Sequence, residues 1–326
     1  MRAAWYSQNG DAHDVLTIGE LSMPAPGPGE IRVRLATSGV NPSDVKARKT
    51  RPLAADRIVP HSDGAGIIDA VGGGVPRRRI GERVWIWNGQ WQRPMGTAAE
   101  YIVVPEAQAV RLPDSVDFAA GACLGIPAMT ACHAIRLLGD IRGKTVLVIG
   151  ASSAVGHYAA QLAVIAGARV IGTAGSADKA KHALDVGVSA TIQYKSEPVP
   201  QRIKELTCGR GADAIVDMDF STTAGWIPEG VLAPHGTLVC YGSNVYGVLP
   251  VPFRDLLFSS ISMHFFLVYD LRQDDRRRVL QELVNLLEAD RLIHTVGARY
   301  RLDDIALAHE AVEGGKLIGN VIVDLV

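Results

Sequence analysis

The sequence lacks the features of a secreted, membrane-spanning or nucleic-acid-binding protein. Its four cysteines include no C-x-x-C pair, which argues against a disulfide framework and against a structural zinc knuckle. No apolar run reaches about 18 residues, and the N-terminus has no continuous apolar segment of the kind found in secretory signals. The formal net charge of −1 favours neither nucleic acid nor an anionic membrane as a partner. We therefore expect a cytoplasmic protein with reduced thiols.

The pattern of apolar and polar residues changes near residue 119. Residues 1–118 consist of short apolar runs separated by Gly and Pro, which is typical of a β-rich, partly barrel-like domain. From residue 119 onward, predicted strands alternate with predicted helices. The strands are expected at 145–149, 169–173, 191–194, 214–218 and 238–241, and the helices at 155–167 and 179–186.

This alternation predicts an α/β fold with a parallel, doubly wound sheet. A helix at 276–289 and a strand-like run at 320–326 follow, and both fit the first domain better than the second. The expected domains are therefore residues 1–118 with 270–326, and residues 119–269.

The stretch "VIGASSAVGHYAAQLA" lies between a predicted strand and a predicted helix, which is the setting of a phosphate-binding turn. Gly150 allows the sharp turn, and Gly156 lets the helix pack closely on the strand. Ser153 and Ala154 take positions where glycine is common, but both are small, and a serine hydroxyl can itself bind a phosphate oxygen. Free N–H groups at the helix start would face a pyrophosphate. The stretch predicts a dinucleotide site.

The end of the second predicted strand indicates which dinucleotide binds. An NAD site places a carboxylate there to hold the ribose 2′-hydroxyl, but this chain reads Thr173-Ala174-Gly175-Ser176. Lys179 and Tyr194 lie nearby in the predicted arrangement. Small residues with a cation and a hydroxyl suit a 2′-phosphate. The sequence predicts NADPH, unless Lys179 is only a solvated helix residue.

Seven motifs run through nearly the whole chain in a fixed order. They are "SGVNPSDVKAR", "GAGIIDAVG", "LGIPAMTACHAI", "GASSAVGHYAAQLA", "GTAGS", "GTLVCYGS" and "HEAVEGGKLIGNVIV". Together they resemble the medium-chain dehydrogenase/reductases of the zinc-independent quinone oxidoreductase (zeta-crystallin-like) branch. The resemblance implies a GroES-like catalytic domain made from both chain ends, a Rossmann nucleotide-binding domain between them, and NADPH-dependent reduction.

The zinc-binding members of that superfamily have ligands that this chain lacks. Asn41 stands where they have a cysteine, and Ser62-Asp63-Gly64 where they have a histidine before an acidic residue and a glycine. His61 is displaced by one residue and is expected to be a loop histidine. Residues 85–101 contain no cysteine, so the four-cysteine structural lobe is missing as well. Without thiolate and imidazole at the right spacing no tetrahedral site forms, and no metal is expected.

Without a metal, hydrogen-bond donors must polarise the substrate carbonyl. This favours substrates already activated toward hydride, namely quinones or α,β-unsaturated carbonyl compounds. The expected enzyme is thus an NADPH:quinone or enone oxidoreductase. Two alternatives remain open: a crystallin-like NADPH-binding protein with little turnover, and an alcohol dehydrogenase-like enzyme.

The resemblance also suggests which residues form the site. The expected catalytic residues are Asn41, Lys46 and Thr130, although Asn41 could be a turn residue and Thr130 a helix cap. Lys46 stands where bacterial quinone reductases of this branch often have a tyrosine. The expected cofactor-binding residues are Gly150, Ser152, Ser153, Ala154, Val155, Gly156, Gly175, Ser176, Lys179, Tyr194, Gly242, Ser243, Asn244, Leu267, Val268 and Asn320.

Four further expectations concern packing and assembly. Asp44 and Arg48, four residues apart, are expected to pair. The tryptophans at 85, 87 and 91 form either an aromatic wall or part of the core. The segment 217–221 is bulkier than in relatives and would narrow either the adenosine side or the nicotinamide side of the cleft. The apolar run 262–268 is an exposed sheet edge, which relatives pair across a two-fold axis, so a homodimer is expected.

Overall fold

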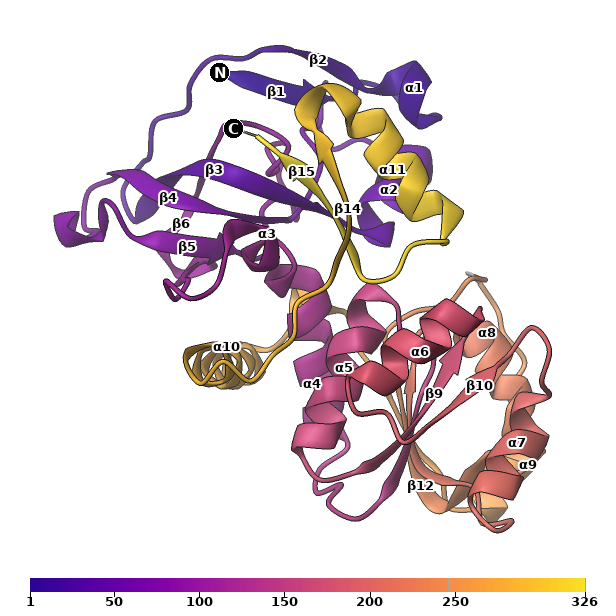
Figure 1. Ribbon diagram of the computed structural model, residues 1–326. Coiled ribbons are helices and arrows are strands. Elements are labelled where there is room, and N and C mark those ends of the chain that lie inside the picture. The colour runs from indigo at the N-terminus through magenta and orange to yellow at the C-terminus, as the bar shows by residue number, and fades with distance from the viewer. Residues whose placement is uncertain (246, 326) are drawn as a thin grey trace. The chain divides into compact units, whose positions relative to one another are not determined.

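Figure 1 shows the computed structural model, which describes residues 1–245 and 247–325. The chain forms two compact units, one of Met1–Pro127 with Val284–Val326 and one of Ala128–Leu283. We name them the terminal unit and the central unit. The boundaries expected at 118 and 270 lie earlier in the chain than these. The later second boundary follows from a helix, Gln273–Glu288, whose Glu282 pairs with Arg136 of the central unit at 3.0 Å.

The terminal unit is built on a mixed sheet of seven strands. Six follow the order β14-β15-β3-β4-β5-β7, and β6 pairs with β3 off this path. The bounds are β3 (Glu30–Val40), β4 (Asp63–Val71), β5 (Arg83–Ile86), β6 (Tyr101–Pro105), β7 (Ala109–Arg111), β14 (Val296–Arg301) and β15 (Asn320–Asp324). β15 lies antiparallel to β3, so the two ends of the chain share one sheet.

Four α-helices and a small second sheet complete the terminal unit as far as its residues are described. The bounds are β1 (Arg2–Trp5), β2 (Thr17–Glu20), α1 (Ala12–Val15), α2 (Pro42–Thr50), α3 (Phe118–Gly121) and α11 (Ile305–Gly314). Alternation along β3 directs Ile31, Val33 and Leu35 inward, where they are almost fully buried. They pack with residues of β4 and β5 into one apolar core.

The central unit contains six parallel strands in the order β10-β9-β8-β11-β12-β13. The bounds are β8 (Thr145–Val148), β9 (Arg169–Ala174), β10 (Ala190–Gln193), β11 (Ala212–Asp217), β12 (Leu232–Cys240) and β13 (Ser262–Phe265). In chain order this is 3-2-1-4-5-6, the arrangement of a doubly wound dinucleotide-binding sheet. All four residues of β8 are buried, as a strand covered on both faces requires.

Seven α-helices accompany these strands in the described part of the central unit, and the last of them extends five residues beyond Leu283. The bounds are α4 (Met129–Leu137), α5 (Ala154–Ile165), α6 (Ala177–Asp185), α7 (Val199–Leu206), α8 (Phe220–Thr223), α9 (Phe253–Phe258) and α10 (Gln273–Glu288). The predicted α/β fold with a doubly wound parallel sheet is confirmed. β12 begins six residues earlier than expected, at Leu232 rather than 238.

Two observations concern the described residues as a whole. None of the helices formed by residues 1–245 and 247–325 is long and apolar enough to cross a bilayer. The four cysteines are all free thiols, and three of them are buried.

Candidate functional site

The residues expected to hold the cofactor in the central unit gather at one edge of its sheet. Parallel strands present their carboxyl ends at the same edge, which is where nucleotides bind in doubly wound folds. Gly150 follows β8, Gly175 follows β9 and Tyr194 follows β10. Gly242 follows β12, and Leu267 follows β13. Residues separated by more than 100 positions in the sequence therefore share one edge.

The turn after β8 has the geometry of a phosphate-binding turn. Gly150 has φ +69°, and a Cβ there would lie 2.5 Å from the Met218 sulfur. At Gly156 a Cβ would lie 2.0 Å from the Gly150 carbonyl oxygen, so only glycine fits. The Ser153 hydroxyl accepts a hydrogen bond from the Gly156 N–H at 3.0 Å and caps α5. The Ser153 side chain is therefore the N-cap of α5.

The N–H groups that remain at the start of α5 can bind an anion. The first i→i−4 bond of this helix runs from His157 N to Ser153 O at 2.9 Å. Helix geometry leaves the N–H groups of Ala154 and Val155 without such a partner. With Ser152 beside them, they can face a pyrophosphate.

Residues at the end of β9 contact the same phosphate-binding turn. Thr173 accepts the Gly150 N–H on its hydroxyl at 2.8 Å, which ties β9 to the turn. Ser176 caps α6 by accepting the Lys179 N–H at 3.3 Å. A Cβ on Gly175 would lie 2.8 Å from the Tyr194 hydroxyl, so that hydroxyl sits directly against the glycine.

Lys195, which directly follows Tyr194, was not among the site residues expected from the sequence. Partial burial lowers the pKa of Lys179, and the positive charge of Lys195 lowers it further. Both lysines belong to the segments that follow β9 and β10, where the Tyr194 hydroxyl lies against Gly175. The position of Lys195 immediately after Tyr194 was the only signal in the sequence.

The bulky segment after β11 is held in place by hydrogen bonds. The Asp219 carboxylate accepts the Asn244 N–H at 2.9 Å and the Asn244 side-chain amide at 2.8 Å. Despite partial burial, these bonds and those from Ser221 and Thr222 lower the pKa of Asp219. Asn244 thus serves as an anchor for this segment. Met218, packed against Gly150, places the extra bulk beside the phosphate turn.

The remaining residues of the central unit take different positions. Ser243 donates its hydroxyl to the Val245 carbonyl at 2.8 Å. Leu267 is half exposed, whereas Val268 is buried at the start of a short turn of helix. Thr130 is buried in the first turn of α4.

In the terminal unit, Asn41 is the N-cap of α2, and Asp44 completes a capping box with it. The Asn41 backbone N–H donates to Asp44 at 2.8 Å, and its side-chain amide donates to Asp63 at 2.8 Å. Burial raises the pKa of Asp44 to about 7 and that of Asp63 well above its usual range. Since Val321 pairs with Val40, Asn320 lies next to Asn41 across the sheet.

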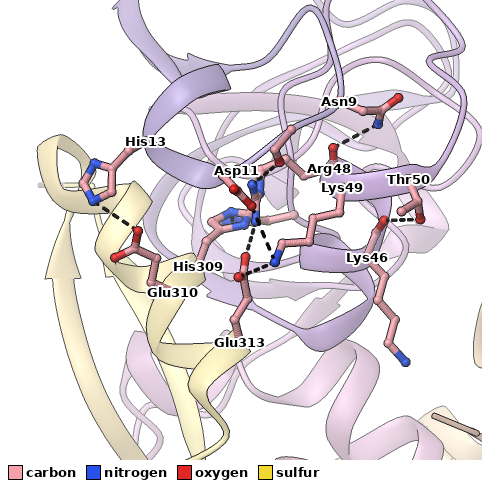
Figure 2. Close-up of polar contacts among 12 residues, drawn as sticks. Asn9, Asp11, His13, Lys46, Arg48, Lys49, Thr50, His309, Glu310 and Glu313 are labelled. Carbon is pink, nitrogen blue, oxygen red and sulfur yellow. Dashed lines mark hydrogen bonds and ion pairs between the residues drawn. The ribbon is translucent and has the colours of Figure 1, made fainter.

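The side chains of α2 point in different directions, as Figure 2 shows. Lys46 is exposed and extends away from the ion pairs between α2 and α11. The expected pairing of Asp44 with Arg48 is wrong. Arg48 is fully buried and instead pairs with Glu313 of α11 and donates to the Gly10 carbonyl, while Asp44 caps its own helix. Tertiary packing has overridden the i,i+4 spacing.

Two of the three tryptophans belong to the interior. Trp85 is fully buried in β5. Trp87 is nearly so, and its indole N–H donates to the Ala107 carbonyl at 3.2 Å. Trp91 is partly exposed, and the Arg51 guanidinium lies 5.7 Å from its ring centre. For Trp85 and Trp87 the core interpretation holds.

The residues at the zinc-ligand positions are engaged with one another. Asp63 accepts hydrogen bonds from Asn41 and from the Ile126 N–H. His61 is a buried loop residue, bonded to Ser38 and His309 at 2.8 and 2.9 Å. Among residues 1–245 and 247–325, no group of three or more His, Cys, Asp or Glu side chains could hold a metal ion. This donor set does not fit zinc.

A mixed sheet built from both chain ends, combined with a six-stranded doubly wound sheet, is the architecture of the medium-chain dehydrogenase/reductases. Comparison with known families gives the same class. Residues 27–114 match the alcohol dehydrogenase GroES-like domain, and residues 154–288 match the family described as zinc-binding dehydrogenase.

Individual relatives cover the whole chain. The quinone oxidoreductase of Pseudomonas aeruginosa is 30% identical over 319 residues, which span 95% of each chain. An NAD-dependent alcohol dehydrogenase has a similar structure (30% identity, TM-score 0.89, 100% of both chains). So has a mycobacterial protein solved with NADPH (27% identity, TM-score 0.87, 100% of both chains). The chain belongs to the quinone oxidoreductase family of the medium-chain dehydrogenase/reductase superfamily.

Proposed function

We propose that this protein is an NADPH-dependent, zinc-free reductase of quinones or α,β-unsaturated carbonyl compounds. The observation that carries the proposal is the end of β9, where Gly175 and Ser176 stand in place of the carboxylate of an NAD-binding sheet and the Tyr194 hydroxyl lies against Gly175. Membership in the quinone oxidoreductase family supports the substrate class.

Different residues at the sheet edge would bind different parts of NADPH. The N–H groups of Ala154 and Val155 at the start of α5 would hold the pyrophosphate. Lys179 and Lys195 would bind the 2′-phosphate, with the Tyr194 hydroxyl as a neutral donor beside Gly175. The NADPH held by the mycobacterial relative supports this assignment. The cofactor contacts assigned above to Leu267, Val268 and Asn320 stay part of the proposal.

The chemistry would be hydride transfer without a metal. When bound, NADPH supplies a hydride at nicotinamide C4. The chain's own residues orient the acceptor and donate hydrogen bonds to its carbonyl oxygen. We assign this to Asn41, Lys46 and Thr130. Asn41 offers an amide held by Asp63, Lys46 an exposed ammonium, and Thr130 a hydroxyl.

The test of the cofactor assignment uses three lysines. Lys179→Ala and Lys195→Ala are each expected to raise the NADPH Kd about ten- to a hundredfold, because a hydrogen bond to a charged group contributes roughly 1.5–3 kcal/mol. NADH binding should barely change. Lys181→Ala is the matched control, since Lys181 lies on α6 as well but is exposed and pairs with Asp185 at 2.7 Å. Equal wild-type affinity for NADH and NADPH would overturn the assignment.

We also propose a homodimer formed through the β13 edge. β13 is the last strand of the sheet order, and Phe265 at its end is 57% exposed. Phe253 and Phe258 of the neighbouring α9 are 70% and 78% exposed. Exposed apolar edges of this kind promote association unless they are paired. Light scattering at micromolar concentration should give twice the mass of the chain, and a monomer would count against the proposal.

A further inference from the structure

Asn41 does not stand alone in the terminal unit, because a buried carboxyl group holds its side chain. Asp63 has no exposed surface, and its Oδ2 accepts the Asn41 amide at 2.8 Å. The same carboxyl group accepts the Ile126 N–H at 2.9 Å on each oxygen. A carboxamide with one N–H engaged cannot rotate freely about its last side-chain bond. The second N–H is therefore held in one direction.

The position of the Asp63 carboxyl group is fixed by the backbone around it. A Cβ on Gly125 would lie 2.1 Å from Asp63 Oδ1 and 2.8 Å from its Cγ. The carboxyl group therefore occupies the space that any other residue at 125 would fill. A Cβ on Gly39 would likewise approach the Asp63 Cβ to 3.1 Å. The close packing of Gly125 and Gly39 against Asp63 therefore restricts its carboxyl group to one position.

A chain of hydrogen bonds ends at the backbone carbonyl of Asp63. Thr97 donates its hydroxyl to the Asp63 carbonyl at 2.5 Å, so it accepts from Ser38 at 2.7 Å. Ser38 in turn accepts from His61 Nδ1 at 2.8 Å, which makes His61 Nε2 an acceptor. The N–H that bridges the two imidazoles, 2.9 Å apart, then belongs to His309. Every donor in this chain points toward the backbone of Asp63.

We propose that Asp63 is the positioning residue that fixes the Asn41 carboxamide for carbonyl reduction. The inference rests on the proposed function, because it needs Asn41 to donate to the substrate. Asp63 would act only through Asn41. A fixed amide is already oriented for the transition state, so no rotational freedom is lost there. A freely rotating amide would present its oxygen as often as its N–H.

A single variant of Asp63 tests whether this residue orients the Asn41 carboxamide. In Asp63→Asn, the new amide can offer its own N–H to the Asn41 oxygen and turn the Asn41 carboxamide around. We expect kcat with 9,10-phenanthrenequinone to fall at least tenfold. The NADPH Kd should stay within about twofold, because the residues assigned to the pyrophosphate and the 2′-phosphate lie in the central unit.

The double variant N41D/D63N restores an amide–carboxyl pair with its ends exchanged. We expect its melting temperature to return to within about 2 °C of wild type while kcat stays at least tenfold low. Asp69→Asn is the control on the same strand: its carboxylate pairs with Arg32 at 2.9 Å, away from Asn41, so stability should fall slightly and kcat should change less than about twofold.

Three outcomes are decisive. Wild-type kcat in Asp63→Asn would overturn the inference and leave the proposed function intact. Recovery of kcat together with melting temperature in the double variant would show that the pair is only structural. Absence of turnover in the wild-type protein, with either a quinone or an enone, would overturn the proposed function itself.

Discussion

Glu313 of α11 pairs with two cations of α2, one buried and one exposed. Comparing the two ion pairs tests how much burial increases the contribution of an ion pair to the free energy of unfolding. The Arg48 side chain has no exposed surface, whereas the Lys49 side chain is 39% exposed, and both pair with the Glu313 carboxylate (Figure 2). Glu313→Gln removes the negative charge that pairs with the buried guanidinium and leaves it only neutral oxygen acceptors, among them the Gly10 carbonyl. Removal of one member of a buried pair costs about 3–5 kcal/mol of unfolding free energy. Since Glu313 itself is 23% exposed, we expect about 3 kcal/mol.

Lys49→Ala is the control on the same carboxylate. An exposed ion pair contributes about 0–1 kcal/mol, so this variant should be nearly as stable as wild type. Urea unfolding followed by tryptophan fluorescence suits the measurement. Four of the five tryptophans, at positions 5, 85, 87 and 91, lie in the terminal unit with Glu313. Equal losses in Glu313→Gln and Lys49→Ala would refute the argument that burial makes the Arg48 pair important.

Three further predictions concern single residues. Ser153→Ala removes the cap on the Gly156 N–H and should cost about 1 kcal/mol of unfolding free energy, whereas Ser153→Gly should cost only a few tenths, as urea titration can show. Burial lowers the pKa of His309 to about 3, so only the unfolded state takes up its proton below pH 6.5, and stability is lost as pH falls from 6.5 toward 3. The wild-type slope of unfolding free energy between pH 6 and 5 should exceed that of His309→Asn by about 1.4 kcal/mol per pH unit, and equal slopes would refute this. Lys46→Met should lower kcat/KM at least tenfold with unchanged NADPH affinity, and unchanged turnover would make Lys46 a surface residue.

The phosphate-binding turn could be predicted because its information is local. Gly150, Ser153 and Gly156 lie within seven positions, and the strand before them and the helix after them have clear periodicity. The doubly wound sheet follows from the same alternation. The bounds of α5 and β9 differ from the expected ranges by no more than two residues.

The contacts that position the site could not be predicted, because they join distant segments. Arg48 pairs with Glu313, 265 positions away, although Asp44 is available one helical turn earlier. The Tyr194 hydroxyl reaches Gly175 only because β10 lies next to β9 in the sheet. Asp63 meets Ile126, 63 positions on, through a gap left by a glycine. No spacing rule in the sequence encodes such pairs.

The central claim is that this chain reduces activated carbonyl compounds with NADPH and without zinc. The most direct test is the initial rate of cofactor oxidation at 340 nm with 9,10-phenanthrenequinone and a short enone, with NADPH and NADH compared. The account predicts turnover with at least one acceptor, at least tenfold greater kcat/KM for NADPH, and no loss of activity to a chelator. Failure to oxidise NADPH with either acceptor, or chelator-sensitive alcohol oxidation with NAD⁺, would contradict it.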